Sequence, residues 1–204
     1  MPLQKSNKKK SALREWIESF LIAAIIATFV RTLFFQMYRI PTESMVPVLL
    51  PGDKVFVDRL RYGTRIPLTN IHLDGFKQLQ RGDIVVFVPP QEAALPWYKR
   101  KQFIKRLIGL PGEHVAIKGG DIYVNGQLIA DPLIAKNYYR SDPQFGEYGT
   151  ADKEVLVPPG KYFFLGDNSA NSKDSRDWGF ADKQWVVGRA LFIWWPPQRI
   201  GKIY

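Results

Sequence analysis

A serine and a lysine in this chain could form a catalytic pair if the fold brings them together. Ser44 lies in the segment IPTESMVP at residues 40–47. Pro41 and Pro47 restrict the backbone around it, so we expect Ser44 on an extended, locally rigid segment rather than inside a helix. Taken alone, the segment is better explained as a proline-rich linker with an ordinary solvated hydroxyl.

Lys105 is the second residue whose position suggests chemistry. It lies in QFIKRLIGL at residues 102–110, a predicted strand in which Phe103, Lys105 and Leu107 share one face. Burial on that face would lower the lysine pKa, and a neutral amine can take a proton from a serine hydroxyl. Arg106 cannot do so, because a guanidinium does not deprotonate in proteins. The alternative is an edge-strand lysine whose ammonium group reaches solvent.

The loop GDNSANSKDSRDWG at residues 166–179 follows a predicted apolar strand. Its polar side chains could orient catalytic groups, or the loop could simply be solvated. Histidine-based catalysis is not indicated: no G-x-S-x-G segment occurs, and His72 and His114 fit ordinary surface positions. The chain has no cysteine, which excludes disulfides and thiolate zinc sites. We expect no metal and no cofactor.

One long apolar run would position these residues relative to a membrane. Residues 1–14 are lysine-rich and are expected to form a cytoplasmic tail, followed by a transmembrane helix at residues 15–38. By the positive-inside rule, residues 39–204 then lie outside the cytoplasm. A cleavable signal peptide and a buried core helix are the alternatives. The length of the run and the missing small-x-small pair disfavour the first, and the neighbouring basic tail disfavours the second.

The remaining sequence predicts a mainly β domain. Short Val, Ile, Phe and Tyr runs between glycine- and proline-rich turns favour an antiparallel β-sheet, with a smaller β cap or excursion at about 118–160. Asn125-Gly126 is typical of a hairpin turn. Strands are expected at 54–58, 84–88, 102–110, 115–117, 121–124, 161–165 and 186–195. The net charge of +10 suits anionic lipid, and no basic, aromatic-interleaved motif indicates nucleic acid.

Four segments behind this anchor resemble the type I signal peptidases (peptidase family S26). They are residues 40–47, 82–87, 105–112 and 166–179, in the order in which the family has them. The resemblance implies a membrane-bound serine endopeptidase that removes signal peptides from exported preproteins through an acyl-enzyme. Glu43, Val48 and Ser169 stand where the family commonly has glycine, threonine and arginine.

The resemblance also implies residue roles. Ser44 matches the nucleophile and Lys105 the general base, while the Ser44 N–H and the Thr42 hydroxyl match the oxyanion hole. Ser172 matches the serine that orients the lysine. Three further residues match those that hold the 166–179 loop in shape, with Asp174 expected to pair with Arg176: Asp167, Asp174 and Arg176.

A substrate bound as an extended strand would place alternate side chains in shallow pockets that admit alanine, giving cleavage after Ala-x-Ala. The apolar residues expected to line these pockets are Tyr38, Ile40, Met45, Val86 and Ile104.

The partners expected from the resemblance are preprotein signal peptides, membrane lipid and, functionally, the protein export translocon. The expected location is the bacterial plasma membrane, with a thylakoid membrane as the alternative. Two other functions stay open. A self-cleaving repressor-type Ser/Lys peptidase is disfavoured by the anchor and by the lack of a helix-turn-helix. A non-enzymatic membrane-tethered β domain, or an inactive paralogue, would require neither Ser44 nor Lys105.

Overall fold

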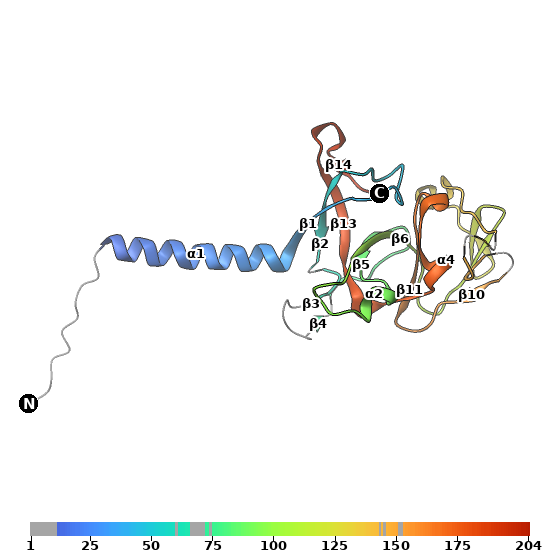
Figure 1. Ribbon diagram of the computed structural model, residues 1–204, viewed down its shortest axis with the longest axis horizontal. Coiled ribbons are helices and arrows are strands. Elements are labelled where there is room, and N and C mark those ends of the chain that lie inside the picture. The colour runs from blue at the N-terminus through green and yellow to red at the C-terminus, as the bar shows by residue number, and fades with distance from the viewer. Residues whose placement is uncertain are drawn as a thin grey trace, which may run out of the picture.

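The computed structural model describes residues 12–59, 61–65, 72–73, 75–142, 144, 146–150 and 153–204 (Figure 1). A long N-terminal helix precedes a domain built from β-strands. Residues 1–11, which hold most of the expected cytoplasmic tail, lie outside the described residues.

The N-terminal helix α1 (Ala12–Phe34) occupies most of the segment expected to cross a membrane. Within the part of the chain that the structure describes, no helix combines the length and apolar character that a membrane crossing requires. The helix also ends earlier than expected, because residues 35–38 belong to strand β1 (Phe35–Arg39). These residues pair with β2, from Phe35 opposite Asp58 to Arg39 opposite Lys54, so sheet hydrogen bonds replace those of a longer helix.

The main sheet confirms the predicted antiparallel β architecture, since all of its described strand pairs are antiparallel. Strand β14 (Gly201–Lys202) also belongs to this sheet, where it pairs with β13 (Val186–Trp195). Across the sheet the order is β1, β2 (Lys54–Asp58), β13 (Val186–Trp195), β5 (Ile84–Phe87), β6 (Phe103–Gly109), β11 (Lys161–Leu165) and β12 (Ala181–Asp182).

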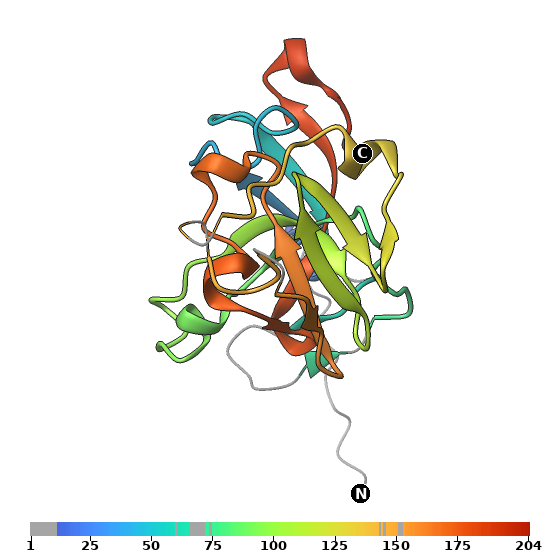
Figure 2. The same ribbon diagram turned by 90° about the vertical axis from the view of Figure 1, so that its right-hand side faces the viewer.

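A second, four-stranded sheet corresponds to the expected excursion. It begins before residue 118, because β7 (His114–Lys118) already pairs with β8 (Asp121–Val124). Asn125 and Gly126 have φ values of 51° and 76° and form the predicted hairpin turn between β8 and β9. Figures 1 and 2 show this sheet at the end of the domain away from α1. Its strands, in spatial order, are β10 (Val155–Leu156), β7 (His114–Lys118), β8 (Asp121–Val124) and β9 (Gln127–Leu128).

The remaining described elements are short. Strands β3 (Thr64–Arg65) and β4 (His72–Leu73) form a two-stranded sheet. The short helices are α2 (Pro90–Ala93), α3 (Pro132–Ala135) and α4 (Ser175–Trp178), with 3-10 turns η2 (Ser169–Asn171), η3 (Lys183–Trp185) and η4 (Pro197–Arg199).

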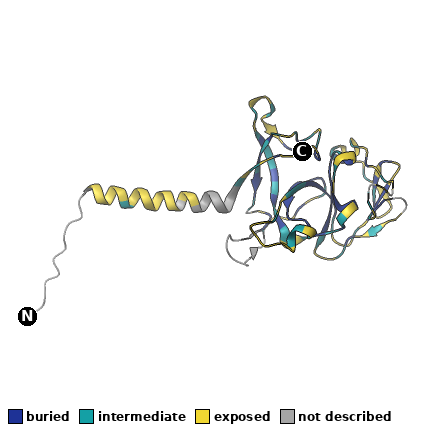
Figure 3. Cartoon of the chain, in the orientation of Figure 1, coloured by how far each residue is buried: buried dark blue, intermediate teal, exposed yellow. Residues whose placement is uncertain are grey.

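The helix and the domain differ in how far their residues are buried (Figure 3). The strands of the domain are largely buried, whereas the described side chains of α1 are largely exposed. Among them are large apolar side chains such as Trp16, 77% exposed, and Phe20, 75% exposed. The domain therefore has its own apolar core, to which these side chains of α1 do not belong.

Candidate active site

Ser44 and Lys105 meet inside the domain. Ser44 lies in the turn that follows β1, and Lys105 lies in β6, opposite Val85 of β5. The Lys105 Nζ is 2.6 Å from the Ser44 Oγ, a hydrogen-bond distance between residues 61 positions apart. Ser44 is 6% exposed and Lys105 is 4% exposed. The lysine is therefore not an edge-strand residue that reaches solvent, and the serine is not a linker residue.

Burial changes the acidity of the lysine. Desolvation lowers the pKa of Lys105 from 10.5 to about 8, while the negative charges of Asp174 and Asp167 oppose this shift. The Nζ also donates to the Ile104 carbonyl oxygen at 3.1 Å, which fixes the direction of the amine. A substantial fraction of Lys105 is consequently neutral near pH 8 and able to accept the proton of the Ser44 hydroxyl.

The loop after β11 contacts the nucleophile segment through its backbone. The Asn168 N–H donates to the Ser44 carbonyl oxygen at 3.1 Å, and the Asn168 amide donates to the Glu43 carbonyl oxygen at 3.1 Å. A Cβ on Gly166 would lie 2.5 Å from the Ser44 carbonyl oxygen and 2.2 Å from the Ser172 Oγ. Glycine at 166 therefore allows the loop to approach Ser44 this closely. Neither Asn168 nor Gly166 stands out in the sequence, because both roles depend on contacts between distant segments.

The predicted pair of Asp174 and Arg176 is confirmed. The Arg176 Nε and Nη2 donate to the two carboxylate oxygens of Asp174, both at 2.9 Å, and both side chains are fully buried. Asp174 also accepts from the Gly166 N–H at 3.0 Å. Ser169, which stands where the family commonly has arginine, accepts from Arg176 Nη1 at 2.6 Å. This short residue therefore completes the network around Arg176.

Asp167 pairs with a partner that the sequence analysis did not identify. The Arg106 Nε and Nη2 each donate to one Asp167 carboxylate oxygen at 2.7 Å, and both side chains are fully buried. Arg106 also donates to the carbonyl oxygens of Gly82 at 2.8 Å and Tyr204 at 3.3 Å. Because Arg106 follows Lys105 in β6, this ion pair ties the loop to the strand that carries the lysine.

Two other residues with expected roles, Thr42 in the oxyanion hole and Ser172 beside the lysine, lie close to the nucleophile segment. The Thr42 Oγ1 lies 3.4 Å from the Ser44 Oγ, so its hydroxyl is near the nucleophile. The Ser172 Oγ is buried and has no hydrogen-bond partner among the described residues, and the expected contact with Lys105 is therefore not formed. Its position beside Gly166 nevertheless places it in the loop segment that contacts Ser44.

The five expected pocket residues lie in or against a single apolar cluster. Ile40, Met45 and Val86 are buried members of this cluster, and Tyr38 and Ile104 pack against it. Burial raises the pKa of Tyr38 to about 12. The structure therefore brings these residues together beside the strand of Lys105 and the turn of Ser44.

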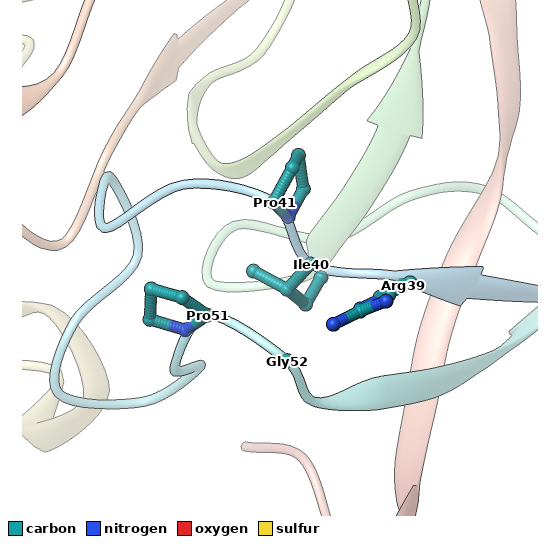
Figure 4. A pocket seen from close by; sticks show the side chains of 5 residues that line it. All are labelled: Arg39, Ile40, Pro41, Pro51 and Gly52. Atoms are coloured by element: carbon teal, nitrogen blue, oxygen red, sulfur yellow. The ribbon is translucent and has the colours of Figure 1, made fainter.

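A pocket of about 470 Å³ lies against the chain that leads into and out of the Ser44 turn. It is lined by Arg39, Ile40, Pro41, Pro51 and Gly52, which Figure 4 shows on two neighbouring runs of backbone. Backbone hydrogen bonds of 2.8 Å from Ile40 to Asp53 and from Gly52 to Ile40 join these runs. Of the five expected substrate contacts only Ile40 lines this pocket.

Among the described side chains, neither a histidine dyad nor a metal site is formed. His114 is about half exposed, and its Nδ1 lies 3.8 Å from the Glu154 carboxylate. Among the described residues no group of three or more His, Asp or Glu side chains is placed to hold a metal ion. The buried Ser44 and Lys105 are thus the arrangement in this domain that best fits nucleophilic catalysis.

Comparison with known proteins gives one consistent family. The profile described as "Signal peptidase, peptidase S26" matches residues 13–195. A probable signal peptidase I-2 of Synechocystis is 35% identical over 98% of this chain and 83% of its own length. Signal peptidase I of Bacillus licheniformis is 33% identical over 99% of both chains. A crystal structure of a signal peptidase I from Enterococcus faecalis is 33% identical, covers 55% of this chain and 97% of its own, and has a TM-score of 0.44.

Proposed function

The chain belongs to the signal peptidase family, peptidase S26, and we propose that it removes signal peptides from exported preproteins with a Ser44/Lys105 dyad. The observation that carries this proposal is the 2.6 Å contact between two buried groups, the Lys105 Nζ and the Ser44 Oγ. A hydroxyl and an amine with a pKa of about 8 form a nucleophile and base that need no histidine.

In the first half of the reaction, neutral Lys105 accepts the Ser44 proton while the Ser44 Oγ attacks the scissile carbonyl carbon. The resulting oxyanion is held by the Ser44 N–H and the Thr42 hydroxyl. The Lys105 ammonium then donates its proton to the leaving amine of the mature protein, and an acyl-enzyme on Ser44 remains. In the second half, Lys105 takes a proton from water, the water oxygen attacks the ester carbon, and Ser44 regains a proton from the ammonium.

Ser172 has a positioning role in this proposal. Its buried hydroxyl has no hydrogen-bond partner in the described part of the chain, and a buried polar group costs free energy until it is satisfied. A rotation of the side chain towards the Lys105 amine in the substrate complex would satisfy it and restrict the amine. Catalytic hydrogen bonds often tighten only when substrate is bound, which is consistent with the missing contact here.

Substrate choice follows from the apolar cluster beside the dyad. Met45 adjoins the nucleophile in the chain, and Val86 and Ile104 are directly opposite each other in β5 and β6. An extended peptide running along this surface would present alternate side chains to it. Because Met45 and Val86 are already almost fully buried, little space is left for a large side chain, and we propose cleavage after Ala-x-Ala.

We further propose that α1 attaches the domain to a membrane, with the N-terminus in the cytoplasm and the catalytic domain outside. The exposed apolar side chains of α1 support the attachment, because lipid would cover what the domain leaves uncovered, and the proposed orientation follows from the positive-inside rule. Substrates delivered by the export translocon would then reach the site while still bound to the membrane. The plasma membrane is the proposed location, and cell fractionation would distinguish it from a thylakoid membrane.

The experiment is cleavage of a preprotein whose signal ends in Ala-x-Ala, by the full chain in detergent. We expect cleavage by the parent and loss of it in Ser44→Ala and Lys105→Ala. Lys118→Ala, which removes an exposed lysine at the end of β7, is the matched control and should retain activity. A folded Lys105→Ala protein with near-parental activity would show that the assigned base is wrong.

A further inference from the structure

The loop between β5 and β6 exposes two neighbouring aromatic side chains. Trp97 is 70% exposed and Tyr98 is 67% exposed, and their rings meet edge to face with centroids 5.8 Å apart. Leu95, in the same loop, is 38% exposed. We call residues 95–101 the aromatic-basic loop. Large apolar side chains gathered on a surface commonly mark a place of interaction.

The same loop carries a concentrated positive charge. Lys99, Arg100 and Lys101 follow the two aromatic residues directly, and the Lys99 ammonium lies 5.9 Å from the centroid of the Tyr98 ring. The only acidic residue between positions 88 and 102 is Glu92, so three basic residues leave this stretch with a net charge of +2. The combination of Trp and Tyr with lysines is the one that membrane interfaces with anionic lipid favour.

The loop is held in shape by its own contacts. The Arg100 Nε donates to the Leu95 carbonyl oxygen at 2.7 Å, and the Arg100 guanidinium lies 4.6 Å from the centroid of the Trp185 ring. The Lys101 N–H donates to the Glu92 carboxylate at 3.0 Å. Because these contacts order the backbone in advance, the exposed side chains can bind a surface with a smaller loss of conformational entropy.

Strand register places this loop and α1 at one end of the main sheet. At this end Phe35 pairs with Asp58, and Asp58 pairs with Arg189 of β13. Further across the sheet, Val186 of β13 pairs with Phe87 of β5, and Phe87 pairs with Phe103 of β6. Helix α1 ends at Phe34, and the aromatic-basic loop lies between Phe87 and Phe103, so both leave the sheet at the same end. Figure 1 shows α2, within this connection, on the part of the domain that α1 joins.

We propose that the aromatic-basic loop docks on the anionic lipid surface of the membrane, as a second contact beside α1. Trp97 and Tyr98 enter the headgroup layer, while Lys99 and Lys101 bind phosphate oxygens of anionic lipids. Two separated attachments fix the rotation of the domain about the axis of α1, which a single helix leaves free. This inference rests on the proposed membrane attachment of α1.

The absence of cysteine from the chain permits a direct test. Single cysteines are introduced as Tyr98→Cys in the loop, Ile22→Cys in α1 and Tyr138→Cys as the control, and each is labelled with an environment-sensitive fluorophore. Tyr138 is 69% exposed and follows α3. Ile134 of α3 packs in one cluster with Ile122 and Val124 of the four-stranded sheet, so this position lies at that end of the domain. The full chain is placed in lipid nanodiscs of phosphatidylcholine alone or with phosphatidylglycerol, both containing a spin-labelled quencher lipid.

We expect quenching at position 22 in both lipids, quenching at position 98 chiefly in the anionic lipid, and none at position 138. Lys99→Gln with Lys101→Gln should lower the docking equilibrium about 25-fold, because each basic residue near an anionic surface contributes roughly fivefold. High salt should act in the same direction. Arg100 is left in place because it holds the loop backbone.

Quenching at position 22 without quenching at position 98 would overturn the loop proposal alone. Equal quenching at positions 98 and 138 would also overturn it. So would a change in the fluorescence of the label at position 98 that depends on added preprotein and not on lipid charge. Lack of quenching at position 22 would instead contradict the attachment of α1, and with it the loop proposal. Preprotein cleavage by the Tyr98→Cys protein in detergent separates these outcomes from a failure of the proposed enzymatic function.

Discussion

Replacing the buried Lys105 by methionine is expected to stabilise the protein at neutral pH while abolishing its activity. Desolvation lowers the pKa of Lys105 to about 8 in the native state, against 10.5 for an unperturbed lysine. Below pH 8 the lysine is charged in both states, so folding carries the full cost of burying the charge. The gap between the two pKa values corresponds to roughly 3 kcal/mol.

The substitution also removes two hydrogen bonds, from the Nζ to the Ser44 Oγ and to the Ile104 carbonyl oxygen. Together these contribute about 1–2 kcal/mol, so the net gain at pH 7 is about 1–2 kcal/mol. Between pH 8 and 10.5 the native lysine is neutral while the unfolded chain still binds a proton. The stability of the parent therefore rises with pH through this window, and the advantage of the variant disappears.

The assay is guanidinium unfolding of the full chain in detergent micelles at pH 7 and pH 10, followed by tryptophan fluorescence. Lys118→Met, at an exposed position, is the control and should change the free energy of unfolding little at either pH. If Lys105→Met is instead less stable than the parent by the same amount at both pH values, the native and unfolded states bind this proton equally, and burial does not lower the pKa of Lys105.

Three further substitutions test the surroundings of the dyad. Asp167→Asn leaves the fully buried Arg106 without its counter-ion and should destabilise the protein by about 3–5 kcal/mol, measured by denaturant unfolding; an unchanged midpoint would contradict the buried ion pair. Gly166→Ala places a Cβ 2.5 Å from the Ser44 carbonyl oxygen. We expect it to lower kcat while leaving the free energy of unfolding less affected, and an unchanged kcat would show that the loop can move away without displacing Ser44. Thr42→Val should lower kcat about 100-fold or more with little change in KM if its hydroxyl holds the oxyanion, and a change confined to KM would assign Thr42 to substrate binding instead.

The sequence predicts those parts of the site that depend on residue type and local spacing. Ser44 and Lys105 stand out because a proline-flanked serine and a lysine among apolar strand residues are chemically unusual. The Asp174–Arg176 pair is two residues apart, and its contact needs no knowledge of the tertiary fold. The strands predicted at 54–58 and 161–165 coincide with β2 and β11, because a short apolar run between two turns usually forms a buried strand.

Contacts between distant segments could not be predicted in this way. Arg106 and Asp167 are 61 residues apart, and nothing local to either one indicates its partner. Gly166 is required only because the loop packs against the Ser44 carbonyl, a relation set by sheet order. Strand β1 could not be predicted for a similar reason. Its sequence, FQMYR, continues an apolar helical run, and it forms a strand because it pairs with β2.

The pH dependence of kcat/KM for preprotein cleavage by the parent tests the dyad most directly. Because Lys105 must be neutral to act as the base, we predict an acidic limb with an apparent pKa of about 8. The active fraction would be about one tenth at pH 7 and about one hundredth at pH 6. A rate that does not change between pH 6 and pH 9 would contradict the assignment of Lys105 as the base that activates Ser44.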